Sequence, residues 1–439
     1  MTANDFQVRN GFSKGAAMIG RRILLAATAS AALLAAGTAY AADCDVTVGL
    51  VMELTGPAGE YGQAGAKSVE MAFRDINDAG GVAGGCKLVT DTRDSQSQGN
   101  VAVDAATQLV QVKKVPVIIG GIISSVSIPI LTSVTAPAHV VQVSPASSSP
   151  TLTALGREGK TNGVFFRMIT SDALQGVAAG KFAVDQGLKK LAIIHVNDDF
   201  GVNMVQEFSK AYTAMGGEIV SDTPYNAKQA SYQAEVTKAL QGSPDALYLV
   251  ATPVDGATIA RQWISQGGPQ KFLLNDSMNS DDFIKAVGAK YLENAYGTSS
   301  GTDTTPSTDY FNANYKAFSN IDPGAPAAVQ GYDAGAIVGL AIAQAGKGES
   351  AAIQDSIRKI LDPKGTVIHA GKDEFAKALA LIKEGKPIKY EGVIGPVSFD
   401  QYGDITGPFR LWKITNGEVT TVGTMSTADV DAIKAKMGN

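Results

Sequence analysis

The chain has 439 residues, of which 45% are hydrophobic and 18% charged, and its formal net charge is −5 at pH 7. This composition is typical of globular proteins and excludes disordered, fibrous and membrane-embedded chains. Because one domain usually takes about 100–200 residues, the length predicts at least two domains. The acidic balance argues against nucleic acid as a partner.

Residues 1–42 are predicted to be a signal peptide. Two adjacent arginines precede an apolar run over residues 23–36, and small residues follow, as signal peptidase requires. We expect cleavage after Ala41 or Ala42 and export to the periplasm. A membrane anchor is the alternative, but the run is shorter than the roughly 20 residues that a bilayer span needs. Cleavage would change the net charge to about −8, since the segment carries four basic residues and one acidic residue.

The chain contains two cysteines, Cys44 and Cys86. In an oxidising compartment an isolated pair commonly forms a disulfide, which would join the start of the first predicted strand to the start of the second. Acylation of Cys44 is the alternative, but Asp43 occupies the position where a small residue is needed. We therefore expect the disulfide.

Short β-branched runs alternate with amphipathic runs along most of the chain. This alternation is typical of parallel sheets covered by helices, so the predicted fold class is α/β. The first half is expected to contain strands over residues 46–51, 87–91, 115–120 and 140–143, and helices near residues 62–78, 100–112 and 126–135.

The same alternation restarts after Arg167, which predicts a second lobe. Helices are expected there near residues 173–186, 202–215, 232–241 and 256–266, and strands over residues 190–195, 218–221, 246–251 and 272–275. Later helices are expected near residues 308–318, 325–345, 353–361 and 372–382, and later strands near residues 396–400, 409–415 and 418–422. No long linker separates the lobes, which favours several chain crossings between them.

Polar residues follow two of the predicted strands in the first half. One strand runs into Ser124 and Ser125, where a helix should begin with free backbone N–H groups. The other runs into Ala146, Ser147 and Ser148, which lie between two prolines. Open parallel sheets bind ligands beyond the carboxyl ends of their strands, and free N–H groups bind carboxylates. A helix cap and a plain loop are the alternatives, but together the segments predict a carboxylate site.

Several segments carry a resemblance to a known family. They are Leu54-Thr55-Gly56-Pro57, Tyr61-Gly62-Gln63, Asp75-Ile76-Asn77-Asp78-Ala79-Gly80-Gly81-Val82, Ser144-Pro145-Ala146-Ser147-Ser148-Ser149-Pro150, Phe165-Phe166-Arg167 and Gly331-Tyr332-Asp333-Ala334. With these segments, from about residue 46 to residue 422, the chain resembles the leucine/isoleucine/valine-binding protein family. Members of that family are type I periplasmic binding proteins of ABC importers.

The resemblance implies two Rossmann-like lobes with parallel-sheet cores, joined by three hinge crossings, with the ligand in the cleft between them. We expect lobe 1 to comprise residues 43–170 plus 300–408. Lobe 2 would comprise residues 171–299 plus 409–439.

The resemblance also implies roles for individual residues. Ser124, the backbone at Ala146 and the hydroxyl of Ser148 would hold the α-carboxylate and α-amino group of the ligand. Tyr61 would pack on the ligand side chain. Neutral donors of this kind can bind an anion without a buried counter-charge.

From the second lobe the family presents two tyrosines and an acid, where this chain has Phe200, Thr252 and Asp276. The missing tyrosines argue against a branched-chain ligand. Asp276 would pair with a ligand ammonium group, and a helix cap is its alternative role. Arg167 and Asp172 lie where the chain should cross between lobes, and we expect them to touch the ligand or to form a hinge ion pair.

Enzymatic functions have weaker support. Gly297–Gly301 matches Gly-x-Ser-x-Gly, but a nucleophile elbow requires a helix directly afterwards, and residues 302–308 are polar and contain proline. His139, His195 and His369 are separated in sequence, so we expect structural roles for them. We predict no catalytic residue, no metal and no cofactor.

The predicted function is that of a periplasmic solute-binding protein of an ABC importer, which captures an amino acid or a related small carboxylate by hinge closure. We expect a monomer that docks on an ABC permease in the inner membrane. A periplasmic sensor that signals to a membrane receptor is the alternative, because the sequence does not mark docking surfaces. A serine hydrolase with its nucleophile in Gly297–Gly301 is a second, less favoured alternative.

Overall fold

The computed structural model describes residues 44–301 and 304–437. The predicted signal peptide and its cleavage site lie outside the described residues. In the part of the chain that is described, no helix is long and apolar enough to cross a membrane.

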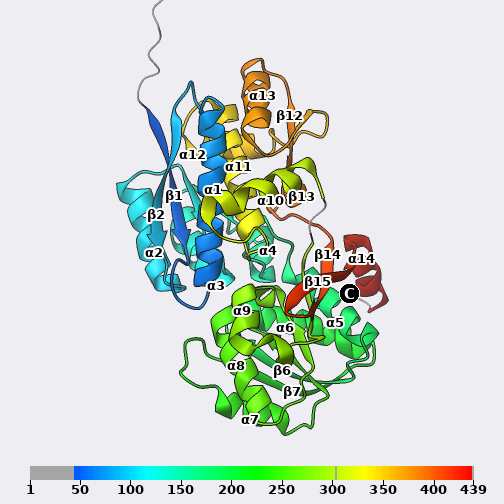
Figure 1. The fold of residues 1–439 in the computed structure, drawn as a ribbon. Helices are drawn as coiled ribbons and strands as arrows, with labels where there is room; N and C mark the ends of the chain where they lie inside the picture. Colours follow the sequence, from blue (N-terminus) through cyan, green and yellow to red (C-terminus); the bar gives the residue numbers. More distant parts are fainter. Residues whose placement is uncertain (1–43, 302–303, 438–439) are drawn as a thin grey trace, which may run out of the picture. The chain divides into compact units, whose positions relative to one another are not determined.

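Five parallel strands form the first sheet, in the order β2-β1-β3-β4-β5 (Figure 1). Helices cover both of its faces. Val48 and Leu50 of β1 belong to one apolar cluster, with helices α1 and α11, whereas Val51 belongs to another cluster, with α2. This alternation follows from the two-residue period of a strand. The strands are Asp45–Met52 (β1), Lys87–Asp94 (β2), Val117–Gly120 (β3), Val141–Ser144 (β4) and Phe165–Arg167 (β5).

The second sheet has seven strands in the order β15-β14-β10-β9-β8-β6-β7. Strands β6 to β10 pair in parallel, whereas β14 and β15 are antiparallel to their neighbours. Ile193 and Ile194 of β6 enter two different apolar clusters, so this sheet is also buried on both faces. Its strands are Lys190–Val196 (β6), Glu218–Tyr225 (β7), Ala246–Val250 (β8), Phe272–Leu274 (β9), Tyr296–Ser300 (β10), Phe409–Thr415 (β14) and Glu418–Met425 (β15).

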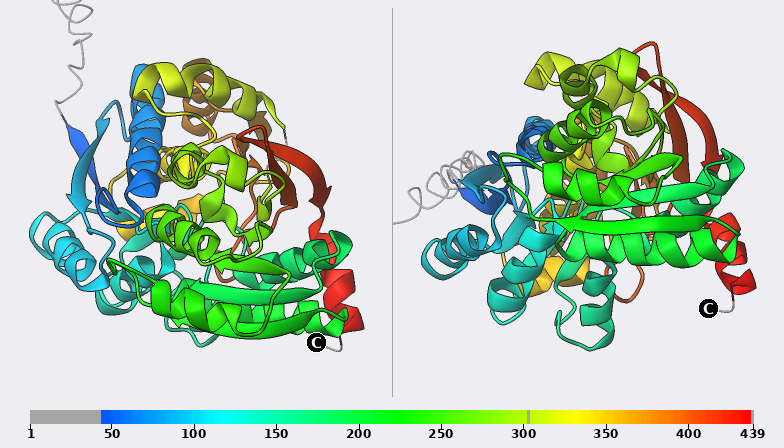
Figure 2. Two further views of the ribbon diagram at one scale, coloured as in Figure 1. Left: turned by 60° about the horizontal axis from the view of Figure 1, so that its bottom comes forward. Right: turned by 90° about the horizontal axis from the view of Figure 1, so that it is seen from below.

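Helices account for most of the remaining described chain. The C-terminal helix α14, red in Figure 2, packs through Val430 against Val177 of α5. The helices are Gly59–Asp78 (α1), Gly99–Thr107 (α2), Ser124–Ile130 (α3), Pro150–Arg157 (α4), Asp172–Asp185 (α5), Asp199–Ala214 (α6), Gln233–Leu240 (α7), Pro253–Ser265 (α8), Asp281–Val287 (α9), Pro306–Ser319 (α10), Ala328–Ala345 (α11), Ser350–Ile357 (α12), Lys372–Lys383 (α13) and Thr427–Lys436 (α14).

The chain passes between the two sheets three times. Strand β5 leads to α5, β10 leads to α10, and β13 (Gly395–Pro396) leads to β14. Helices α10 to α13 and a small sheet of β11 (Thr366–Ile368), β12 (Ile388–Gly392) and β13 pack with the core of the first lobe. The predicted α/β class with two parallel-sheet lobes is therefore confirmed. The boundaries that we assigned to the lobes stay a prediction.

The strand expected near residues 396–400 is wrong. Only Gly395 and Pro396 pair with β12, and the chain then leaves the sheet. The apolar residues Val397 and Phe399 pack into the core of the first lobe, which explains their spacing without a strand partner. The segment instead becomes the third crossing between the lobes.

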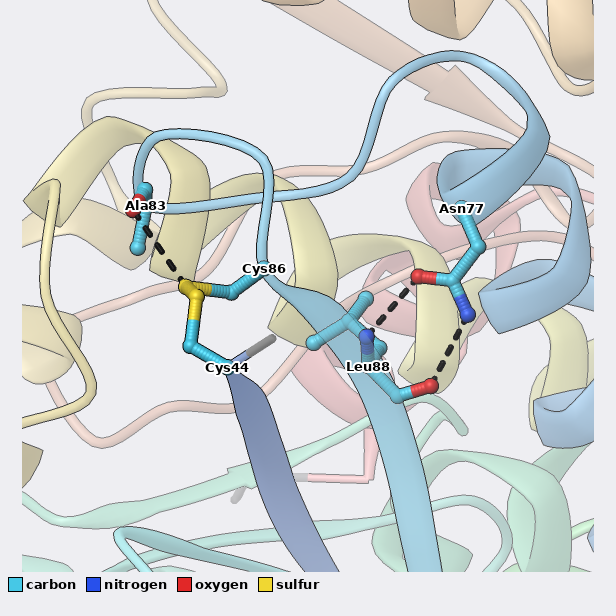
Figure 3. The surroundings of a disulfide bond; sticks show 5 residues. All are labelled: Cys44, Asn77, Ala83, Cys86 and Leu88. Atoms are coloured by element: carbon cyan, nitrogen blue, oxygen red, sulfur yellow. Dashed lines mark hydrogen bonds between the residues drawn. A yellow bond between two sulfur atoms is a disulfide. The ribbon is translucent and has the colours of Figure 1, made fainter. Parts of the chain in front are cut away.

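The predicted disulfide is confirmed, and it joins Cys44 to Cys86 with their Cα atoms 4.8 Å apart. The bond lies where β1 and β2 begin side by side (Figure 3). Nearby, the side-chain amide of Asn77 donates to the carbonyl oxygen of Leu88 at 2.9 Å and accepts its N–H at 2.8 Å. The disulfide and this amide together fix the beginning of the edge strand.

Removal of the disulfide should lower stability without changing the ligand site. The bond closes a loop with a sequence separation of 42, for which the chain-entropy model predicts a loss of about 4 kcal/mol. The double variant Cys44→Ala/Cys86→Ala, unfolded in urea beside the oxidised protein, would measure this loss. An unchanged unfolding free energy would contradict the expectation.

Candidate functional site

A short loop over residues 121–123 follows β3, and α3 begins with Ser124 and Ser125. The prediction of free N–H groups before these serines is wrong for Ile122 and Ile123. Their N–H groups donate to the carboxylate of Glu53, at 3.0 Å and 3.2 Å. Clustered amides attract an anion, and here the protein supplies one from the residue that follows β1.

Glu53 is fully buried. Burial raises the pKa of its carboxyl to about 7, although the two N–H donors oppose this shift. Helix α1 approaches the backbone of Glu53 at Gly62, where a Cβ atom would lie 2.1 Å from the Glu53 carbonyl oxygen. Glycine at this position therefore allows α1 to begin directly beside the loop, with Tyr61 in its first turn.

The loop after β4 is joined to the loop after β3 through buried serines. The hydroxyl of Ser147 donates to the carbonyl oxygen of Ile122 at 3.0 Å and to the Ser127 hydroxyl at 2.6 Å. The N–H of Ser149 donates to Oγ of Ser124 at 3.1 Å. These bonds bring the two predicted loops together, and they give Ser147 a structural task.

Ser148 points from this loop toward the second lobe. Its hydroxyl donates to Oδ2 of Asp172, the first residue of α5, at 2.9 Å, and its carbonyl oxygen accepts the N–H of Asp172. Ala146 is partly buried in the same loop. Asp172 is fully buried, and Oδ1 of its carboxylate has no hydrogen-bond partner among the described residues.

Asp276 follows β9, and its charge acts on Asp172. Burial raises the pKa of Asp172 well above its usual range, and the negative charge of Asp276 raises it further. The pKa of Asp276 is raised by burial too, while hydrogen bonds from neighbours that include Gln175 lower it. The raised pKa values mean that the ionised forms of both acids are destabilised here, an effect that a nearby cation reverses.

Tyr61 experiences the charge of Asp276. Its ring belongs to the core of the first lobe. Its hydroxyl is buried and has no hydrogen-bond partner among the described residues. Burial raises the pKa of this hydroxyl well above its usual range, and the charge of Asp276 adds to the effect. The charge of Asp276 in lobe 2 therefore acts on Tyr61 of lobe 1, while the predicted contact of Tyr61 with a ligand side chain stays a prediction.

The other predicted residues of lobe 2 lie at the ends of neighbouring strands. Phe200 is partly buried in the first turn of α6 and packs on the core of the lobe. Thr252 precedes α8, and its hydroxyl lies 3.5 Å from Oδ2 of Asp255. Burial raises the pKa of Asp198 at the start of α6, and the hydroxyl of Ser125 in lobe 1 partly opposes this shift.

Four further buried residues lie outside the predicted set of site residues. Oε1 of Gln175, the hydroxyls of Tyr225 and Tyr248, and Oγ1 of Thr298 are buried without a partner in the described part of the chain. Burial raises the pKa of the Tyr248 hydroxyl well above its usual range, and the negative charges of Asp172 and Asp276 raise it further. In the sequence, a tyrosine inside a strand cannot be distinguished from an ordinary core residue. Only the position of Tyr225 at the carboxyl end of β7 could have signalled a role.

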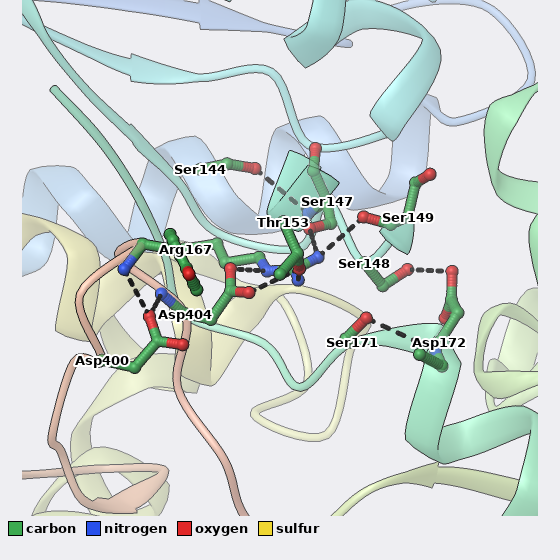
Figure 4. A network of polar contacts seen from close by, with 12 residues as sticks. Ser144, Ser147, Ser148, Ser149, Thr153, Arg167, Ser171, Asp172, Asp400 and Asp404 are labelled. Carbon is green, nitrogen blue, oxygen red and sulfur yellow. Dashed lines mark hydrogen bonds and ion pairs between the residues drawn. The ribbon is translucent and has the colours of Figure 1, made fainter. Parts of the chain in front are cut away.

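Arg167 does not pair with Asp172. Its Nε donates to Oδ1 of Asp404 at 2.7 Å (Figure 4). The predicted hinge ion pair thus exists with a different acid, one that is 237 positions away. No local pattern could identify it.

The serine hydrolase alternative loses its structural basis. Gly297–Gly301 falls on β10, where Ser299 pairs with Arg410 of β14, so the segment is extended and forms no nucleophile elbow. Nε2 of His195 lies 3.2 Å from Oδ1 of Asp222. Over residues 44–301 and 304–437, no group of three or more His, Cys, Asp or Glu side chains could hold a metal ion.

A groove of about 1130 Å³ lies beside the site, lined by residues of both lobes such as Gln63, Arg261 and Arg410. None of the predicted ligand-binding residues lines it. At its edge the hydroxyl of Ser280 donates to both carboxylate oxygens of Glu60, at 2.9 Å and 2.8 Å. This contact joins the two lobes at the groove.

Comparison with known proteins identifies the class. The chain matches the model of a periplasmic binding protein family over residues 45–418. It belongs to this family, and within it to the leucine/isoleucine/valine-binding type. It is therefore a binding protein and not an enzyme, as predicted.

Particular relatives agree with this assignment. Leu/Ile/Val-binding protein homolog 3 of Brucella melitensis is 27% identical over 400 residues, which cover 90% of this chain and 98% of the relative. Leucine binding protein LivK of Thermotoga maritima has a similar structure, with a TM-score of 0.74, 22% identity and coverage of 88% and 99%. A solute binding protein of R. palustris in complex with benzoate has a TM-score of 0.70, 19% identity and coverage of 87% and 96%. The two structures support the fold.

Stability should depend on pH through Glu53. In the folded protein the pKa of Glu53 is about 7, above the ordinary value of 4.5, so protonated Glu53 favours the folded state. This contribution to stability is complete below about pH 4.5 and is lost as pH rises through 7. The size is on the order of 3 kcal/mol. Urea unfolding from pH 4.5 to 8 should show a falling unfolding free energy, and Glu53→Gln should make the slope less steep. Glu158→Gln, at an exposed acid, is the control; equal slopes in all three proteins would contradict the assignment.

Proposed function

We propose that this protein captures an α-amino acid, or a small zwitterion like it, between its two lobes. The observation that carries the proposal is the pair of acids Asp172 and Asp276, one at the start of α5 and one beyond β9. Both have raised pKa values through burial, and Oδ1 of Asp172 lacks a partner within the described chain. A ligand ammonium group between them would supply the missing charge and hydrogen bonds.

The anionic half of such a ligand would meet Ser124, Ala146 and Ser148. This half of the site is weaker than the sequence alone suggests, because Glu53 takes two of the loop amides. A purely anionic ligand would also approach several negative charges. The ammonium group is therefore the main determinant, in contrast to the neighbour from R. palustris, which was solved with benzoate.

Hinge closure is the proposed mode of capture. Lobe 1 supplies Tyr61 and Ser148, lobe 2 supplies Asp276, and Asp172 lies at the first crossing between them. A ligand that touches both faces binds the closed arrangement better and shifts the population toward it. The bond between Ser280 and Glu60 would add to the closed form.

We further propose that the protein works in the periplasm, after loss of residues 1–41 or 1–42, and delivers its ligand as a monomer to an ABC permease of the inner membrane. The family supports this role, since its members are periplasmic binding proteins. Co-purification with a permease from detergent-solubilised membranes, in the presence and absence of ligand, would test the partner.

Calorimetry with matched ligands tests the chemical class. A panel of L-amino acids is titrated first, and we expect at least one to bind more tightly than 1 mM. For the best ligand, the deaminated acid of the same skeleton should bind at least roughly 100-fold more weakly, because it lacks the ammonium group. Benzoate, which has a carboxylate and no ammonium group, is titrated for comparison. Tight binding of benzoate, with no amino acid binding below 1 mM, would overturn the proposal.

Substitution of the acid tests the residue. Asp276→Asn should weaken binding of the best amino acid by roughly 10- to 100-fold through the loss of a charge-assisted hydrogen bond. Asp281→Asn, at an exposed acid of the same segment, should leave affinity unchanged. Because binding an ammonium group favours the ionised carboxylates, wild-type affinity should rise with pH. Equal affinity of both variants would remove Asp276 from the site.

A further inference from the structure

Arg167 holds the backbone on both sides of Ser148 (Figure 4). It is fully buried at the end of β5. Its Nη1 donates to the carbonyl oxygens of Ser147 at 3.2 Å and Ser149 at 3.0 Å. The guanidinium thus restrains the peptide groups that orient the hydroxyl of Ser148 toward Asp172.

Asp404 and Thr153 complete a ring with Arg167. Nε of Arg167 donates to Oδ1 of Asp404 at 2.7 Å, and Nη2 donates to Oγ1 of Thr153 at 2.8 Å. The hydroxyl of Thr153 in turn donates to Oδ2 of Asp404 at 2.5 Å. Thr153 lies on α4, directly after the ligand loop. Each bond involves a charged group in a dry surrounding, so the ring resists distortion.

Asp404 belongs to the third crossing between the lobes, which follows β13. In that segment the carbonyl oxygen of Gly403 accepts the N–H of Arg167 at 3.0 Å. Next to it, Ile405 forms a parallel bridge with Thr170, which lies on the first crossing. Two of the three crossings and the ligand loop therefore meet at one guanidinium.

We propose that Arg167, Asp404 and Thr153 act as a clamp that couples the hinge to the ligand loop. They are positioning residues, and we expect none of them to touch the ligand. Hinge motion changes backbone angles in the crossings, while a buried ion pair keeps its partners together because separation would leave charges unpaired. The loop over residues 147–149 must then follow the crossing that carries Asp404. This inference rests on the proposed function, since it names how the same site is assembled.

Hydrogen exchange without ligand tests the clamp. Thr153→Val removes the bridging hydroxyl and keeps the shape of the side chain. We expect exchange of the Ser149 and Asp172 N–H groups, which donate to Ser124 and Ser148, to become about 10-fold faster. Thr153→Ser, which restores the hydroxyl, should return the rates to wild type.

Tyr310→Phe is the matched control. It also removes a hydroxyl that donates to a buried carboxylate, at 2.9 Å from Asp75, but on α10 and not on either of the two crossings that meet at Arg167. Its exchange rates at Ser149 and Asp172 should equal those of the wild type. If Thr153→Val leaves these rates unchanged, or if the control raises them equally, the clamp is refuted and the ring is a structural contact.

Distances between spin labels provide the hinge readout. Labels at Val112→Cys in lobe 1 and Lys238→Cys in lobe 2 lie on exposed positions, and the native cysteines are joined in a disulfide. Asp404→Asn should broaden the ligand-free distance distribution, and Tyr310→Phe should not. A distribution for Asp404→Asn identical to the wild type refutes the coupling. Since both readouts need no ligand, failure of the amino-acid screen would refute the proposed function alone.

Discussion

A carboxylate withdrawn from water needs hydrogen-bond donors, and this requirement organises the protein around its cleft. Glu53 receives two loop amides, Asp404 receives a guanidinium and a hydroxyl, and Asp333 receives the hydroxyl of Tyr390 and two N–H groups beyond β12. In each case the donors come from segments far away in sequence. The buried acids therefore tie the chain together at points where apolar packing alone would leave loops unrestrained.

Asp172 departs from this rule. One of its oxygens is satisfied by Ser148, and the other has no partner among the described residues. Nearby stands a second acid, Asp276, which raises its pKa further. A fold that satisfies its other buried acids and leaves this one incomplete is organised to receive a group from outside, which is the physical basis of the proposed ammonium site.

Parallel sheets with helices on both faces follow from patterns that are local in sequence, and so they could be predicted. Apolar β-branched runs of four to eight residues indicate buried strands, and β1, β6 and β8 appear where they were expected. The disulfide could be predicted because two cysteines leave one pairing. The strand expected near residues 396–400 is absent because Val397 and Phe399 are spaced for packing into the core and not for pairing in a sheet.

The candidate site was predictable to the extent that its residues follow strand ends. Ser124, Ser148 and Asp276 obey that rule, and the structure brings their segments to the region between the lobes. Glu53 and Asp404 could not be selected, because their partners lie 69 and 237 residues away. Gln175 lies inside α5 and not at a strand end, so the rule that selected the other residues does not select it.

The sequence by itself determined the α/β class, the two lobes, the disulfide and the family, because these depend on local periodicity, residue counts and short motifs. Only the tertiary structure decided which charges meet. It gave the loop amides to Glu53, exchanged the expected partner of Arg167 for Asp404, and placed Asp172 beside Asp276. Electrostatic energy depends on distance and burial, and both arise only when the three crossings bring remote segments together.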